Sequence, residues 1–332
     1  TGEPNGILSE NAIHLVTKHI PEPSKVEIKK LLQIAAKKAA SLGLTTVQAN
    51  DLEGASALDS HFRAYKELAE SQELPIRINL QGTMGTKRDL ANYTKACDSQ
   101  QSLGNHLQLG PIKLYADGSL GGRTAALSYP YHDAPETKGM ALYPQNELDE
   151  LVLAAAHANL QVAVHAIGDE AIDMIISSYE RAKSTVPGWS KRPRIIHCQI
   201  TKPEQLQRMA SLGIVADIQP IFVPTDLHFV ESRVGKTHAS STYAWKTMRD
   251  MGIATAGGSD CPVESCNPLS GLHAAITRQD LKGNPPGGWH PKERLSPMEA
   301  LSLFTIGSAY AAHEEDIKGS LSPGKYGDFV IL

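Results

Sequence analysis

Four residues that can contribute to a metal site lie near the ends of short apolar segments. Lys113 lies in an apolar run that leads into the glycine-rich loop 118–122, and His165, His197 and Asp260 end three further runs. A lysine buried in a strand costs free energy unless another group uses it. Histidine nitrogens and carboxylate oxygens are common zinc ligands, and a lysine becomes one after carbon dioxide converts its amine to a carbamate. These residue types at four strand ends predict a metal-dependent enzyme.

Each of these residues also has a less specific interpretation. A lone histidine in such a position is more often a hydrogen-bonded core residue than a ligand, but two at consecutive strand ends favour a metal site. Lys113 could instead pair with Asp117 or contact a substrate carboxylate. For substrate binding, the candidates are three polar residues at or after strand ends: Asp117, Arg123 and Gln219. Asp169 could orient His165, although we expect it to cap the following helix.

The elements that would position these residues alternate between strands and helices. The seven expected strands are 44–49, 74–80, 111–116, 161–166, 194–199, 214–219 and 253–258. The expected helices are 24–42, 57–71, 86–103, 147–159, 171–183, one that begins at Thr201, 243–251 and 299–312. Residues 221–241 are expected to form a long polar loop. Capping boxes are expected at Ser24 with Glu27, Thr201 with Glu204, and Ser296 with Glu299. This alternation predicts a parallel sheet, and in a parallel barrel the chemistry lies where strands end.

Composition excludes several other classes of protein. The 332 residues suit a single barrel, and a net charge of −4 without blocks of like charge gives no sign of a nucleic-acid or membrane partner. No apolar run approaches the ~18 residues of a membrane span. The four cysteines lack zinc-finger spacing, so we expect reduced thiols and a cytoplasmic protein. No G-x-G-x-x-G motif follows the first strand, which leaves a dinucleotide-binding fold without support.

Taken together, several motifs resemble those of the amidohydrolase superfamily, most closely its family 3, the YtcJ-like branch. They are KLYADGSLGGRT (113–124), HAIGD (165–169), RIIH (194–197), GSDCPV (258–263) and PMEAL (297–301). The resemblance implies an α/β fold, a (β/α)8 TIM barrel, that hydrolyses amide-like C–N bonds of a small molecule through a metal-activated water. It also implies that a carboxylated Lys113 bridges two divalent ions, for which we expect zinc. His165 and His197 would hold one ion, and Asp260 would contact the other and act as general base.

The chain departs from the family in one respect, because it contains no His-x-His pair. Its first strand corresponds to the second strand of the family, so we expect a barrel that lacks the first strand and most of the flanking β-sandwich. Residues 1–320 would form the barrel, and residues 321–332 would start a C-terminal β-sandwich strand.

Because one strand is missing, we expect a gap between strands 44–49 and 253–258, partly filled by residues 1–20. Dimerisation would be another way to cover the two exposed strand edges. An ion would then bind at Lys113, His165 and His197. The alternative function is a truncated, non-catalytic binding or regulatory barrel.

Overall fold

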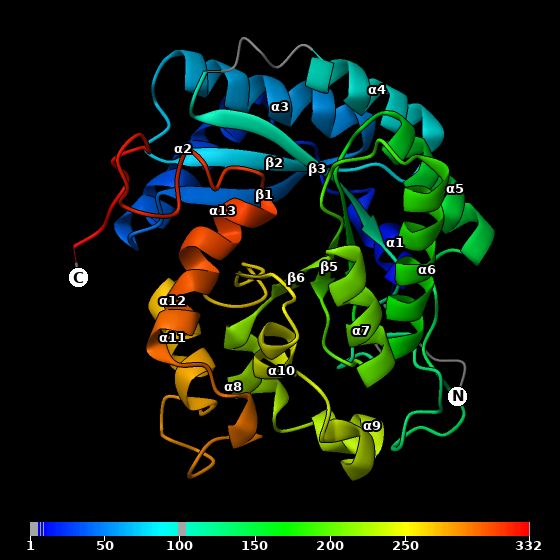
Figure 1. Cartoon of the computed structure of the whole chain (residues 1–332). Coiled ribbons are helices and arrows are strands. Elements are labelled where there is room, and N and C mark those ends of the chain that lie inside the picture. The colour runs from blue at the N-terminus through cyan, green and yellow to red at the C-terminus, as the bar shows by residue number, and fades with distance from the viewer. Residues whose placement is uncertain (1–5, 7, 9, 99–103, 332) are drawn as a thin grey trace.

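A computed structural model describes residues 6, 8, 10–98 and 104–331. Its centre is a curled, parallel sheet of seven strands in the order β1-β2-β3-β4-β5-β6-β7 (Figure 1). The strands are β1 (Thr46–Glu53), β2 (Arg77–Thr83), β3 (Leu107–Tyr115), β4 (Val162–Ala166), β5 (Arg194–His197), β6 (Val215–Ile218) and β7 (Thr255–Gly257).

The order of the strands in the sheet is their order in the chain, as the alternation of strands and helices predicts. Every observed strand overlaps an expected one. The largest shifts of a boundary are at the end of β1, which extends to Glu53, and at the start of β3, where Leu107 pairs with Ile78 of β2. The α/β class and the seven parallel strands are therefore confirmed, in the form of an open half-barrel.

Helices cover the outer face of the sheet, with α3 and α4 over β1–β3 and α5 and α6 beside β4 and β5 (Figure 1). The longer helices are α2 (Lys25–Ser41), α3 (Gly54–Glu70), α4 (Lys87–Asp98), α5 (Gln145–His157), α6 (Asp169–Thr185), α7 (Pro203–Leu212), α9 (Val230–Ala239) and α11 (Pro268–Thr277). The shorter ones are η1 (Glu10–Ile13), α1 (His14–Thr17), η3 (Pro220–Phe222), α8 (Val223–Asp226), α10 (Trp245–Asp250), η4 (Pro291–Glu293), α12 (Pro297–Ser302), η5 (Leu303–Gly307) and α13 (Ser308–Ala311).

Two of the three expected capping boxes form, at Ser24 with Glu27 and at Ser296 with Glu299. The third is wrong, because α7 starts one residue later than expected. Lys202 is its N-cap, and the Lys202 backbone N–H donates to the side-chain oxygen of Gln205. The last five residues of the expected helix 86–103 lie outside the described part of the chain.

The outward face of the sheet is apolar, and helix side chains complete its hydrogen bonding. The Tyr93 hydroxyl of α4 donates to the Leu80 and Gly110 carbonyls, and the Tyr179 hydroxyl of α6 donates to those of Val162 and Arg194. Several polar side chains are nevertheless buried on the strands: Asn79, Gln81, Lys113, Arg194 and Asp217. Buried polar groups need partners, so polar chemistry is concentrated on these strands.

The two edge strands, β1 and β7, do not pair with each other. The expectation that residues 1–20 partly fill this gap stays a prediction, because residues 1–5, 7 and 9 lie outside the described part of the chain; residues 13–20 are exposed. Ser308, the first residue of α13, bridges the two edge strands. Its backbone oxygen accepts a hydrogen bond from Gln48 Nε2 of β1 at 2.9 Å, and its hydroxyl donates to the Gly257 carbonyl of β7 at 3.3 Å.

The C-terminal residues pack against the start of β2 and form no strand between 321 and 331. Asp328 pairs with Arg77 at 2.7 Å, and the Arg77 guanidinium lies 3.8 Å from the centre of the Tyr326 ring. The expected strand is therefore not formed here, and the assignment of this segment to a β-sandwich stays a prediction. Among the described residues, no helix has both the length and the apolar character needed to cross a bilayer.

Candidate active site

Three of the four predicted ligands, Lys113, His165 and His197, lie close together toward the carboxyl end of the sheet. Lys113 lies on β3, His165 on β4, and His197 is the last residue of β5. The imidazole rings of His165 and His197 meet edge to face, with centroids 4.4 Å apart. The Lys113 ammonium lies 4.7 Å from the centre of the Tyr115 ring, and that ring is 5.5 Å from His165. Adjacent parallel strands thus place the lysine and both histidines in one cluster.

Burial keeps the charge of this cluster low. It lowers the pKa of Lys113 to about 8, an effect that the negative charges of Asp260 and Asp217 oppose. Burial also lowers the pKa of His165 to about 4 and holds that of His197 well below its usual range, and the Lys113 charge lowers both further. Both imidazoles are therefore neutral near pH 7, which is the state that binds metal ions.

Hydrogen bonds fix the tautomer of each histidine. His165 Nε2 lies 2.9 Å from the Gly118 carbonyl oxygen, which can only accept, so Nε2 carries the proton. His197 Nδ1 lies 2.8 Å from Gln219 Oε1, and the amide of Gln219 donates to the Asp217 carbonyl through Nε2. His197 therefore carries its proton on Nδ1. The unprotonated atoms are Nδ1 of His165 and Nε2 of His197.

These two atoms fit a divalent ion. In metal sites, a ligating histidine usually donates its second ring N–H to a carbonyl or carboxylate, as both histidines do here. A lysine with a lowered pKa is also more often neutral, and a neutral amine is needed for carboxylation. The donor chemistry of Lys113, His165 and His197 thus suits the predicted ion.

Asp260 lies at the open side of the sheet, three residues after β7, and is exposed. Neighbouring protein atoms partly exclude water from its carboxyl and thereby raise the pKa of Asp260, while the positive charge of Lys113 opposes the rise. Asp260 and His197 both have a positive φ, 55° and 81°, which costs non-glycine residues about 1 kcal/mol or more. In the described part of the chain, no three His, Cys, Asp or Glu side chains lie close enough to hold an ion together. The convergence of Asp260 with the two histidines stays a prediction.

Asp117 is buried and holds the strand ends together. Its carboxylate accepts the backbone N–H groups of Ala126, Ile167 and Gly168 at 2.8–3.0 Å, and it lies 3.4 Å from His165 Nε2. Burial raises its pKa to about 7, and the three N–H groups oppose that rise. Gly168 has to be glycine, since a Cβ atom there would lie 1.9 Å from the Ala126 oxygen.

The other two substrate-binding candidates also contact protein groups. Gln219 orients His197, and Arg123 pairs with Asp133 through two hydrogen bonds of 3.0 Å. Substrate contacts of Asp117, Arg123 and Gln219 therefore stay predictions. Asp169 neither caps α6, whose N-cap is Gly168, nor contacts His165: it accepts from Ser128 and pairs with Lys202.

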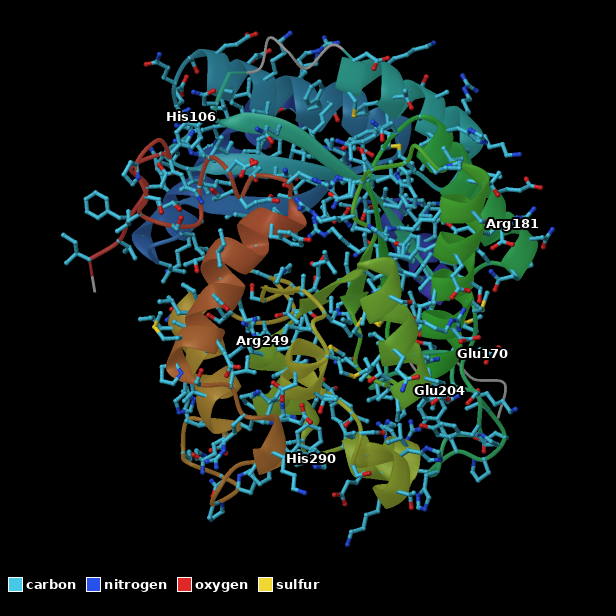
Figure 2. The ribbon with its side chains drawn as sticks, in the orientation of Figure 1. His106, Glu170, Arg181, Glu204, Arg249 and His290 are labelled. Carbon is cyan, nitrogen blue, oxygen red and sulfur yellow. The ribbon has the colours of Figure 1, made fainter. Side chains whose placement is uncertain are left out.

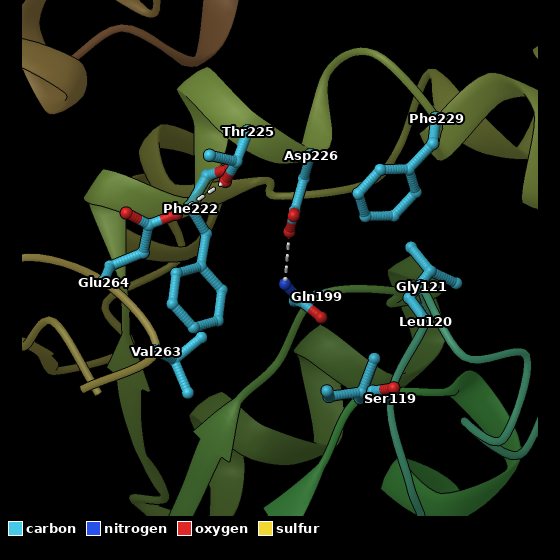
Figure 3. Close-up of a pocket in the computed structure, with 11 residues that line it drawn as sticks. Ser119, Leu120, Gly121, Gln199, Phe222, Thr225, Asp226, Phe229, Val263 and Glu264 are labelled. Atoms are coloured by element: carbon cyan, nitrogen blue, oxygen red, sulfur yellow. Dashed lines mark hydrogen bonds between the residues drawn. The ribbon is translucent and has the colours of Figure 1, made fainter. Parts of the chain in front are cut away.

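A cavity beside the histidines was not predicted. Residues 221–241 read as a polar loop, but they form η3, α8 and α9, which place Phe222, Asp226 and Phe229 over the strand ends (Figure 3). The Phe222 ring stacks on His197 with centroids 6.0 Å apart. The apolar residues of this segment, above all Phe222 and Phe229, were the available signal, because an exposed loop has little use for them.

Known proteins share this fold. The crystal structure of an uncharacterized metal-dependent hydrolase from Pyrococcus furiosus superposes with a TM-score of 0.81 at 27% identity, covering 99% of this chain and 67% of that one. The putative amidohydrolase YtcJ of Bacillus subtilis is 33% identical over this whole chain and 61% of its own length. N-substituted formamide deformylase of Arthrobacter pascens is 28% identical over 60% of this chain and 37% of its own.

The chain thus spans about three fifths of the length of YtcJ. The sequence profile of the amidohydrolase family matches residues 1–332. With the resemblance of its motifs and the shared fold, this match shows that the chain belongs to the amidohydrolase family.

Proposed function

We propose that this protein is a metal-dependent amidohydrolase that hydrolyses the C–N bond of a small amide-like molecule. The observation that carries the proposal is the pair of neutral imidazoles, His165 and His197, in contact beside the buried Lys113. Family membership and the name of the formamide deformylase relative support this reaction class.

Each residue has a distinct role in this proposal. His165 and His197 hold a divalent ion, by our expectation zinc, through the nitrogens left unprotonated by Gly118 and Gln219. Lys113, carboxylated or neutral, adds a third donor. When bound, the ion polarises the amide carbonyl and makes water more acidic. Asp260 takes the proton of the attacking water and returns it to the leaving amine, a task for which a raised carboxyl pKa is suited.

The test combines metal content with hydrolysis. We expect the purified chain to bind zinc, measured by atomic emission, and His197→Ala to lose it. N-Benzylformamide is the probe for hydrolysis, with formate as the measured product. Asp260→Asn should lower the rate of formate release about 100-fold or more, while the circular dichroism spectrum of the variant stays unchanged. Asp250→Asn, the same change on the exposed face of α10, is the matched control.

Two results would contradict the proposal. An Asp260→Asn variant that keeps most of the activity would show that another base does the work. A folded chain that binds no ion would favour the alternative, a non-catalytic binding or regulatory barrel. We also propose that the protein is cytoplasmic and that its two open strand edges favour a homodimer. A sedimentation coefficient that corresponds to a monomer in analytical ultracentrifugation would rule out the dimer.

A further inference from the structure

A cavity of about 180 Å³ opens beside the histidine pair (Figure 3). The loop after β3 forms one wall through residues 119–121, and the loop after β7 forms another through Val263 and Glu264. Gln199, which follows β5, lies at its base, and η3, α8 and Phe229 close it from above. Gly118, which fixes the tautomer of His165, directly precedes Ser119 of the wall. The cavity therefore adjoins the histidines, through Gly118 beside His165 and through Phe222, which stacks on His197.

Two carboxylates, Asp226 and Glu264, face this cavity. Asp226 Oδ2 accepts from the Tyr243 hydroxyl at 2.6 Å and from Gln199 Nε2 at 3.0 Å, while Glu264 accepts from the Thr225 hydroxyl at 2.9 Å. All of these donors are neutral, and none of the described residues that line the cavity is a lysine, arginine or histidine. The protein thus holds two neighbouring acids in place without neutralising either.

Asp226 is partly buried, which makes this arrangement costly. Burial raises its pKa to about 6, the charge of Glu264 raises it further, and the hydrogen bonds from Tyr243 and Gln199 oppose the rise. The group is then still mainly ionised near neutral pH. A partly buried carboxylate without a counter-ion is destabilising, so a bound cation would offset the cost.

The remaining walls are apolar and partly aromatic. Leu120, Ile167 and Val263 line the cavity together with the rings of Phe222 and Phe229. A cavity of roughly 150 Å³ lined by such side chains can hold a benzene molecule. Aromatic faces also attract organic cations. The size and the lining therefore suit a group as large as one ring that also carries a positive charge.

We infer that this cavity binds a ring-sized organic cation bearing a primary ammonium group, with the ammonium between Asp226 and Glu264 and the apolar part against Phe222 and Phe229. That this cation is the amine side of the substrate rests on the proposed hydrolysis, which would take place at the histidines beside the cavity. The binding of the cation itself does not depend on that reaction.

The probes are benzylamine, which is protonated near neutral pH, and benzyl alcohol, its neutral counterpart of equal size. Their dissociation constants are measured by isothermal titration calorimetry on the whole chain. We expect benzylammonium to bind about ten-fold more tightly or better, because it forms charge-assisted hydrogen bonds. Asp226→Asn and Glu264→Gln should each reduce this preference and leave the affinity for benzyl alcohol unchanged.

Two further variants locate the site. A Cβ atom at Gly121 would meet only the Phe229 ring, at 3.7 Å, so Gly121→Leu should fold and weaken the binding of both probes by filling the cavity. Glu204→Gln removes an exposed acid of α7 (Figure 2) that is not part of the cavity lining, and it should change the affinity of neither probe.

Equal affinities for the two probes, or no binding of either, would overturn the inference. So would a benzylammonium preference that survives both Asp226→Asn and Glu264→Gln. Glu264 is half-exposed, so its substitution keeps the test valid even if Asp226→Asn fails to fold. Normal benzylammonium binding without formate release from N-benzylformamide would contradict the proposed hydrolysis and leave this inference standing.

Discussion

The wall formed by β3, β4 and β5 differs from the two edge strands, β1 and β7, in how firmly it holds polar side chains. On the wall, His165, His197 and Asp117 all have protein partners within hydrogen-bonding distance. At the edges, Gln48 Oε1 is buried without a partner in the described part of the chain, and Asp260 after β7 is exposed. The contrast applies to the site residues and not to every side chain, because Arg194 Nη1 of β5 is also buried without a partner in the described part of the chain.

This difference has a chemical meaning for the site. The histidines have their tautomers and charge fixed before any ligand arrives, which is the preorganisation that metal binding and catalysis need. Asp260 keeps access to water, as a group that moves protons requires. The predictions below test whether the wall is the rigid part of the site and the edges the adaptable part.

The largest effect is expected from Asp117→Ala on the wall. It would leave three buried backbone N–H groups without their acceptor. At about 1 kcal/mol or more for each group, the free energy of unfolding should fall by roughly 3 kcal/mol or more. Urea denaturation followed by circular dichroism measures this change. Asp280→Ala, which removes a carboxylate from an exposed loop, is the comparison, and an equal loss in both variants would contradict the special role of the wall.

The second effect concerns Lys113 and pH in the metal-free protein. Its pKa is about 8 when folded and returns to its ordinary value of 10.5 when unfolded. Between these values the unfolded chain binds more protons, so the free energy of unfolding should rise with pH, by up to about 3 kcal/mol. Lys113→Met should lack this rise in urea titrations across that window. Lys87→Met, at an exposed lysine of α4, should retain it.

A smaller effect is expected when the partner of His197 is removed. Gln219→Leu frees the Nδ1 proton of His197, so the ring loses its fixed orientation. The loss of such a partner typically weakens metal binding about 10- to 100-fold, which competition with a chelating dye would measure. Gln48→Leu, the same substitution on an edge strand, should leave zinc affinity unchanged. Equal losses of zinc affinity in the two variants would mean that the wall strands do not hold the site more firmly than the edge strands do.

The smallest effect is expected at the open edge. Gln48→Ala removes one hydrogen bond to the Ser308 oxygen, across the gap between β1 and β7. The free energy of unfolding should fall by only about 1 kcal/mol, the usual worth of one such bond. Thermal unfolding by calorimetry can resolve this difference. A loss as large as that of Asp117→Ala would show that the edge is as firmly built as the wall.

Much of the fold could be predicted from local sequence. Apolar runs such as 161–166 and 194–199 are buried whichever helix covers them. Their short, continuous apolar character was therefore sufficient to predict β4 and β5. The capping boxes of Ser24 and Ser296 are equally local, because each involves residues only three positions apart. The segment 221–241 was misread for the opposite reason. Its short helices are stabilised by packing over the strand ends, and the apolar residues of the segment indicate burial without indicating which surface they cover.

Local sequence was enough to identify the residues that could carry chemistry. Lys113, His165, His197 and Asp260 lie near strand ends because the strands are apolar and break at polar positions. Their protonation and orientation depend on contacts between distant segments. The proton of His165 is fixed by a carbonyl 47 residues away, and that of His197 by a side chain 22 residues away. The pairing of Arg123 with Asp133, the exposure of Asp260 and the acidic cavity of Asp226 are likewise set by the packing of separate loops. Burial and hydrogen bonding between distant segments decide charge and orientation, and neither can be read from residue type alone.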